Sequence, residues 1–259
     1  MNFSTLTEVQ VIAFALILLR MTGFLFAAAF FNSQTITMPV KILLSFVLSF
    51  LVFSFVKPEF DVARVANTNL LIESSFQEIL LGICIGFVTR MFFFIVTMVG
   101  SLISVIIGLS SSQLFNPMIG DHGNSFEQYY SILATLVFLS FNGHHYLLMG
   151  IEQSYSLIPI GNISIQVGTL AEVVYKFQEM FEITIKMSAP VLMAGLVANV
   201  ALAILGRAVP QINILVTSFP VLVLTGLFVI LLTLPHFVEN LEKVLDTSLQ
   251  NYMQFIRSV

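Results

Sequence analysis

The sequence has 259 residues, of which 58% are hydrophobic and only 9% are charged, whereas a typical soluble domain carries about 25% charged residues. At a mean hydropathy of +0.99, the chain has more apolar surface than a water-soluble fold of this length can bury. The formal net charge of -4 and the lack of a dense basic cluster argue against nucleic acid as a partner. The composition predicts a membrane protein.

Six apolar stretches approach the length that a helix needs to cross a hydrocarbon core, which is about 20 residues for a thickness of about 30 Å. Their approximate bounds are 11–31, 42–56, 79–108, 129–150, 187–206 and 208–238. The stretches are continuous and lack the alternation of barrel strands, so helices are favoured. The sequence predicts an all-α, multi-span fold, in which residues 1–259 form one helical membrane domain.

Three charged residues lie within or beside the first and third apolar stretches. An arginine at the centre of a membrane helix costs about 2.5 to 3.5 kcal/mol, and both Arg20 and Arg90 are in this position. Glu78 precedes Arg90 by about 18 Å of helix, too far for the two to pair. We expect Arg20, Glu78 and Arg90 to make buried contacts within or between subunits. Snorkelling arginines and a solvated helix start are the alternatives.

Small residues recur at four-residue spacing in the third stretch. Gly82 and Gly86 form a G-x-x-x-G motif, and Gly100, Ser104 and Gly108 repeat the spacing further along. Small faces let membrane helices approach closely, where van der Waals contact holds them together. The pattern predicts extensive helix packing.

The connection from Gly108 to Asn124 combines flexible and apolar residues. Glycine gives backbone freedom, proline limits helix continuation, and apolar side chains can close a pore by dewetting. We expect this segment to form part of a gate or plug, with an ordinary external loop as the alternative. The candidate residues are Gly108, Leu109, Leu114, Phe115, Pro117, Met118 and Ile119.

Two segments, at about 167–187 and 236–257, have charged and apolar residues on opposite helical faces. The first leads directly into the apolar stretch 187–206, and a continuous helix over both would be about twice as long as a bilayer core is thick. We expect the second, after Pro235, to dock on a partner or on the membrane surface.

A break is predicted between the last two apolar stretches. Pro210 lacks an N–H and disfavours a helical residue before it, so Gln211 and Asn213 are expected to satisfy free backbone groups in a hairpin. Gly206 and Arg207 precede this break.

The sequence carries no motif for hydrolysis, nucleotide binding or hydride transfer. His144 and His145 are adjacent and lack acidic or cysteine neighbours at ligand spacing, and the single cysteine, Cys84, lies in an apolar stretch. We therefore expect neither catalysis nor a metal or other cofactor.

Several of these residues resemble those of the FliR family, flagellar biosynthetic proteins of the type III export gate, and of its virulence-secretion counterparts. The similarity covers nearly the whole chain, and its most specific element is the run from Gly206 to Asn213. The other residues that carry it are Arg20 with Gly23, Glu78 with Gly82 and Gly86, the loop from Gly108 to Pro117, Phe141 to His144, Pro159 with Gly161, and Phe219 with Pro220.

The resemblance implies a non-enzymatic subunit in the bacterial inner membrane, within the flagellar basal body. It implies assembly with FliP, FliQ and FlhB-like subunits into a gated conduit for unfolded export substrates, built from kinked helical hairpins. The alternative from the residues alone is a self-contained transporter of small molecules or ions. A transporter should show inverted repeats and polar sites at the midplane, and the two halves of the sequence show no convincing repeat.

Overall fold

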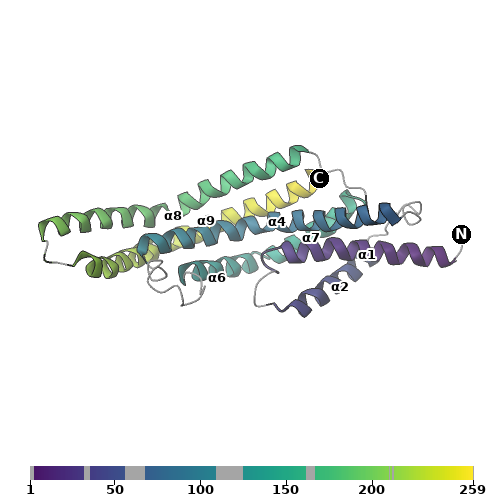
Figure 1. Ribbon diagram of the computed structural model, residues 1–259, viewed down its shortest axis with the longest axis horizontal. Helices are drawn as coiled ribbons and strands as arrows, with labels where there is room; N and C mark the ends of the chain where they lie inside the picture. Colours follow the sequence, from purple (N-terminus) through teal and green to yellow (C-terminus); the bar gives the residue numbers. More distant parts are fainter. Residues whose placement is uncertain are drawn as a thin grey trace. The chain divides into compact units, whose positions relative to one another are not determined.

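The computed structural model describes residues 3–31, 36–55, 68–108, 125–161, 167–209, 211 and 213–258. All regular secondary structure in these ranges is helical, which confirms the predicted all-α class. The helices are α1 (Phe3–Ala27), α2 (Met38–Phe55), α4 (Thr68–Ile107), α6 (Ser125–Ser140), α7 (Gly143–Leu157), α8 (Val167–Ala208) and α9 (Ile214–Ser258) (Figure 1). Within the described ranges, five helices are long and apolar enough to cross a membrane, or six if α6 and α7 count as one span.

Three helices extend well beyond the apolar stretches that predict them. Helix α4 begins at Thr68, ahead of the stretch 79–108, because helical hydrogen bonds continue into polar sequence when one face stays packed. Helix α8 joins the amphipathic segment to the following apolar stretch through Pro190. Helix α9 likewise continues through Pro220 and Pro235. Proline removes one backbone hydrogen bond, and long helices of membrane proteins tolerate that loss.

The stretch 129–150 forms two helices, α6 and α7, instead of one. Asn142 lies between them in the left-handed conformation, with φ 55° and ψ 29°. Asparagine tolerates this conformation better than most residues, and the glycine at 143 follows it. The Asn142 carbonyl accepts hydrogen bonds from the backbone N–H groups of His145 and Tyr146 at 2.9 and 3.4 Å, so it starts α7.

The chain divides into two compact units, to both of which α4, α8 and α9 contribute. The first comprises residues 1–91, 141–175 and 246–259. Its core contains the buried α1 side chains Ile17 and Phe24 and the buried α4 side chains Leu81 and Ile85. It also contains Tyr252 near the end of α9, whose hydroxyl donates a 2.8 Å hydrogen bond to the carbonyl of Leu147 in α7.

The second unit comprises residues 92–140 and 176–245. Gly100 of α4 lies against the backbone of α6, where an added Cβ would meet the Glu127 Cα at 2.8 Å. Two isoleucines at the end of α4 pack against glycines of neighbouring helices. Ile106 contacts Gly195 of α8, and Ile107 contacts Gly226 of α9, at positions where any larger residue would clash. Gly100 of the third apolar stretch thus lies at a close helix contact, as expected for packing without a hydrophobic driving force. Gly108, the last residue of the repeat, does not, because a Cβ added there would meet no atom of the described residues within 4 Å.

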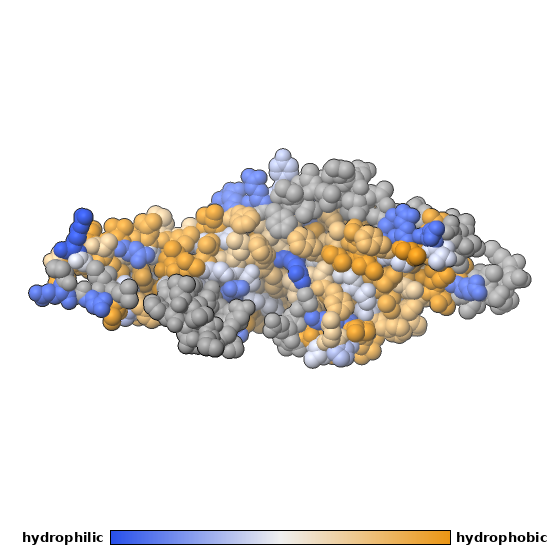
Figure 2. Space-filling model, viewed as in Figure 1, coloured by the Kyte–Doolittle hydropathy of each residue, from blue (hydrophilic) through white to orange (hydrophobic). Residues whose placement is uncertain are grey.

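The surface carries the apolar residues that a soluble protein would bury. Helix α2 turns Lys41, Ser45 and Ser49 inward, with Ser45 and Ser49 bonded to backbone carbonyls of their own helix. Figure 2 shows hydrophobic residues over most of the coloured surface on the visible face. Large exposed apolar side chains on three helices are Ile42, Leu43, Phe46, Val47, Phe50 and Leu51 of α2, Met193, Leu196, Val197, Val200, Ile204 and Leu205 of α8, and Val216, Phe219, Leu224, Phe228, Leu231 and Leu232 of α9.

The apolar stripe in the C-terminal part of α9 is expected from the sequence to dock on a partner or on the membrane surface, and the structure differs. Leu241, Leu245, Tyr252 and Ile256 are all 2% exposed or less. Since the chain itself already covers these side chains, the stripe belongs to the protein core. A stripe of this kind predicts burial but does not reveal what provides it.

Candidate functional site

Helices α1 and α4 meet backbone to backbone at three glycines. A Cβ added to Gly23 of α1 would lie 2.7 Å from the Ile79 carbonyl oxygen, and one added to Gly86 of α4 would lie 2.6 Å from the Phe24 carbonyl oxygen. At Gly82 an added Cβ would collide with the carbonyl of Arg20. The G-x-x-x-G motif of α4 therefore lies on the segment of α1 that carries Arg20.

This close approach places Arg20 of α1 opposite Glu78 of α4. The Arg20 Nε donates to Glu78 Oε2 at 2.6 Å, and its Nη2 donates to Glu78 Oε1 at 3.1 Å. Both side chains are 0% exposed. A planar guanidinium pairs with both oxygens of a carboxylate, which gives the contact a fixed orientation as well as energy.

Helix α7 and the turn after it supply the other partners of this ion pair. The Arg20 Nη1 donates to the Ser154 carbonyl at 3.1 Å and to the Ser154 hydroxyl at 3.3 Å, and Nη2 donates to the Ile158 carbonyl at 3.2 Å. The backbone N–H of Gly161 donates to Glu78 Oε1 at 2.8 Å. The guanidinium also lies over the Tyr155 ring, 4.4 Å from its centroid.

All five N–H groups of Arg20 therefore have acceptors, and both carboxylate oxygens of Glu78 have donors. A buried ion pair is tolerable only when its remaining hydrogen-bonding capacity is satisfied in this way. The Tyr155 hydroxyl closes the cluster by donating to the Ile17 carbonyl at 3.0 Å. We call Arg20, Glu78, Ser154, Tyr155, Ile158 and Gly161 the buried ion-pair cluster; it joins α1, α4, α7 and the turn that follows.

The chemistry of the buried ion-pair cluster is structural. Its two charges neutralise each other and are closed off from solvent, so neither is placed to attack a substrate or exchange a proton with water. Removing either partner would leave an uncompensated charge in a medium that solvates it poorly. The cluster can hold three helices in one arrangement.

Arg90, the third charged residue of the sequence analysis, has a different environment. It is half-buried, and its Nε donates to the backbone carbonyl of Ala27, the last residue of α1. Helix C-termini expose unpaired carbonyls and a partial negative charge, which a guanidinium stabilises. Arg90 therefore caps α1 and is not brought to Glu78.

Helices α8 and α9 are separate, and the connection between them lies where the sequence predicts a break. Helix α8 ends at Ala208, with Gly206 and the exposed Arg207 in its last turn, and α9 begins at Ile214. Asn213 starts α9 through its backbone carbonyl, which accepts from the N–H groups of Val216 and Thr217 at 3.2 and 3.1 Å. Gln211 lies in a turn and is exposed, and Pro210 lies outside the described residues.

Most of the candidate gate residues also lie outside the described part of the chain. These are Leu109, Leu114, Phe115, Pro117, Met118 and Ile119. Gly108, which directly follows α4, has a φ of +83°, a conformation that glycine adopts without the Cβ penalty of other residues.

Several members of the buried ion-pair cluster cannot be predicted from the sequence. Ser154 and Ile158 take part mainly through carbonyl oxygens, which every residue carries, and Tyr155 contributes a ring face. Gly161 is one of the residues that carry the family resemblance, and nothing else in the sequence singles it out. The sequence feature that points to the cluster is an arginine within an apolar stretch. Its charged N–H groups require acceptors elsewhere in the fold.

The similarity to known proteins covers the same residues. The family described as "Bacterial export proteins, family 1" matches residues 11–248, which include the whole buried ion-pair cluster. The chain belongs to this family of bacterial export proteins. The flagellar biosynthetic protein FliR of Aquifex aeolicus (strain VF5) is 28% identical over 242 residues, which are 92% of each chain. FliR of Bacillus subtilis (strain 168) is 30% identical over 211 residues, or 80% of each chain.

The FliR relatives extend to Buchnera aphidicola subsp. Schizaphis graminum (strain Sg), whose protein is 30% identical over 214 residues, 82% of this chain and 81% of that one. The recognition from sequence is thereby confirmed: this is a FliR-type flagellar export protein. Its helices make it a multi-pass membrane protein.

Proposed function

We propose that this export-family protein is a non-enzymatic core subunit of the flagellar type III export gate. In this role it forms part of the gated conduit through which unfolded export substrates cross the bacterial inner membrane. Its partners are membrane subunits of the FliP, FliQ and FlhB type. The observation that carries the proposal is the family match over residues 11–248, with FliR proteins as relatives over most of the chain.

The surface of α8 and α9 supports an assembled state. The most apolar windows of these helices are only 17% buried within the chain, and each helix exceeds 40 residues, or about 60 Å. A bilayer core is about half that thick. Some of their apolar surface must therefore be covered by other protein if these helices stand upright in the membrane, as expected for a subunit of a larger complex.

The buried ion-pair cluster has a defined part in this proposal. Docking against neighbouring subunits needs a rigid surface, because every helix ordered on binding costs affinity. The pair Arg20 and Glu78 holds α1, α4 and α7 together before any partner binds. We assign it the role of preforming the face that the subunit presents.

Residues 108–119 supply part of the seal in this proposal. The support comes from sequence: apolar bulk at Leu114, Phe115 and Met118 can close a constriction, and no charged residue lies between Arg90 and Asp121. Gly108, directly after α4, has a left-handed φ, which gives the segment a defined point of departure from the helix.

Co-purification tests the function directly. A tagged chain expressed with the flagellar membrane subunits, extracted in mild detergent and weighed by native mass spectrometry, should appear in a stable hetero-oligomer. A mass that corresponds to a monomer or a homodimer, together with failure to restore motility to a strain lacking FliR, would instead favour the self-contained transporter.

The seal is tested separately in the assembled gate. Deleting residues 110–119 should leave the hetero-oligomer intact and increase ion leakage across the membrane. Normal assembly without increased leakage would contradict the seal while leaving the export-gate assignment standing.

A further inference from the structure

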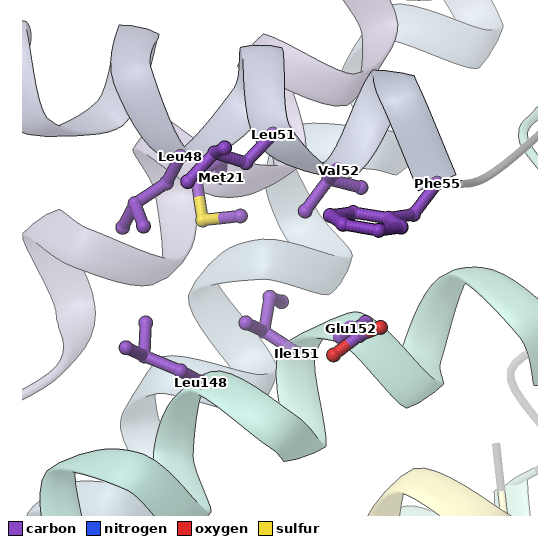
Figure 3. A pocket seen from close by; sticks show the side chains of 8 residues that line it. All are labelled: Met21, Leu48, Leu51, Val52, Phe55, Leu148, Ile151 and Glu152. Carbon is purple, nitrogen blue, oxygen red and sulfur yellow. The ribbon is translucent and has the colours of Figure 1, made fainter.

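An apolar cavity in the first unit has no part in the buried ion-pair cluster. It has a volume of about 310 Å³ and lies between α1, α2 and α7 (Figure 3). The residues that line it are Met21, Leu48, Leu51, Val52, Phe55, Leu148, Ile151 and Glu152. Seven of the eight are apolar, so the cavity is suited to hydrocarbon and poorly suited to water.

The cavity has one polar end. Glu152 of α7 lies at the same end as Phe55, while Leu48 and Leu148 lie at the other end (Figure 3). Phe55 is the last residue of α2, so the carboxylate lies near the end of that span and the apolar end extends toward its middle. From Leu48 to Phe55 the helix advances about 10 Å.

The Glu152 carboxylate is available to bind a ligand. It is exposed, and no hydrogen bond or ion pair joins it to another described residue. An unpaired carboxylate beside an apolar cavity favours a ligand that brings a cationic donor together with an apolar body. A neutral ligand would leave the carboxylate without a cationic partner, and an anionic ligand would be repelled by it.

The cavity opens onto the exposed apolar face of α2, which is long enough to cross the hydrocarbon core of a bilayer. Leu51 and Phe55 line it and are also 49% and 76% exposed, so its rim reaches the outward apolar face of α2. Helix α2 has 18 residues, or about 27 Å, which matches the hydrocarbon thickness of a bilayer. Acyl chains are the natural environment of such a face, and the end of a span is where head groups lie.

We propose that this cavity binds one acyl chain of an aminophospholipid, with the head-group ammonium bound to Glu152. The order of the cavity, apolar toward the middle of α2 and acidic at its end, matches the order of tail and head group in a membrane lipid. The inference goes beyond the export function, and its first test, on the isolated chain, does not depend on that function.

The test measures which lipids stay with the purified full-length chain. The protein is reconstituted in phosphatidylcholine nanodiscs that contain equal minor amounts of phosphatidylethanolamine and phosphatidylglycerol, and retained lipid is counted by native mass spectrometry. The wild-type chain should retain phosphatidylethanolamine over phosphatidylglycerol by on the order of tenfold, the value of one charge-assisted hydrogen bond.

Two variants separate the head-group contact from the tail contact. Glu152→Gln keeps the shape of the cavity and removes its charge, so the preference should fall to near parity while lipid is still retained. Val52→Phe fills the cavity, so both lipids should be lost. The matched controls are Glu8→Gln, at an exposed acid of α1, and Val47→Phe, at an exposed position of α2 that does not line the cavity.

Unchanged selectivity in Glu152→Gln, or unchanged retention in Val52→Phe, would overturn the proposal. It would also fail if the hetero-oligomer retained no such lipid and cross-linking placed a residue of another subunit at Glu152. The cavity would then be a docking site for protein. Retention of phosphatidylethanolamine by the assembled complex, sensitive to both variants, would support it.

Discussion

Replacing Glu78 by glutamine should destabilise the protein by several kcal/mol. Glutamine keeps the size of the side chain and one acceptor oxygen, so the Gly161 N–H can still be bonded, but Arg20 loses its counter-charge at 0% exposure. Removing one partner of a buried ion pair costs about 3 to 5 kcal/mol. Because Glu78→Gln preserves part of the hydrogen bonding, we expect the lower end, about 3 kcal/mol, and the upper end, about 5 kcal/mol, for Glu78→Leu.

The single cysteine provides the assay. Cys84 lies half-buried on α4, close to the contact with α1, so a thiol-reactive fluorophore reports when the two helices separate on heating. The melting temperature should fall in both Glu78 variants, and the double variant Arg20→Met with Glu78→Leu should lose less than the sum of its single changes. Glu73→Gln, at an exposed acid on the same helix, is the control. Wild-type melting of Glu78→Gln would refute the reasoning.

Three further changes test local contacts. Gly86→Ala places a Cβ 2.6 Å from the Phe24 carbonyl oxygen, so α1 and α4 must separate, at an expected cost of about 1 to 3 kcal/mol in thermal unfolding. Asn142→Val should cost about 1 to 2 kcal/mol because a β-branched residue resists the left-handed conformation, whereas Asn142→Gly should melt like the wild type. Tyr252→Phe removes the hydrogen bond to the Leu147 carbonyl and should cost about 1 kcal/mol, with secondary structure unchanged by circular dichroism.

The helical class and the approximate spans could be predicted because hydropathy reports the environment of a whole segment. The limits of α2 follow the apolar stretch 42–56 closely, whereas α1 begins at Phe3, well ahead of the stretch 11–31. The break before α7 could not be found in this way, since Phe141 keeps the stretch apolar and only Asn142 and Gly143 signal a turn. Helix α9 shows the opposite error: the sequence analysis separates the apolar stretch 208–238 from an amphipathic segment after Pro235, and one helix continues through both.

The two charged residues of the buried ion-pair cluster could be anticipated, whereas most of the residues around them could not. The energetic cost of an arginine in a membrane segment points to Arg20 and to the need for a partner, and Glu78 lies directly before an apolar stretch, where it can supply that partner. Ser154 and Ile158, more than 130 residues away in sequence, act through backbone carbonyls. Which carbonyls face a given side chain depends on the tertiary fold, and one sequence carries no local signal for it.

Helix α2 shows how the sequence encodes a reversed interior. Lys41, Ser45 and Ser49 recur every four residues and face inward, while the opposite face is apolar and exposed. In water this orientation would expose hydrocarbon and cost free energy at each position. In lipid or against another subunit the same orientation is favourable, because hydroxyl groups must be satisfied within the protein and apolar groups meet an apolar environment. A polar stripe at helical spacing within an apolar stretch therefore predicts which face of a span turns toward its own chain.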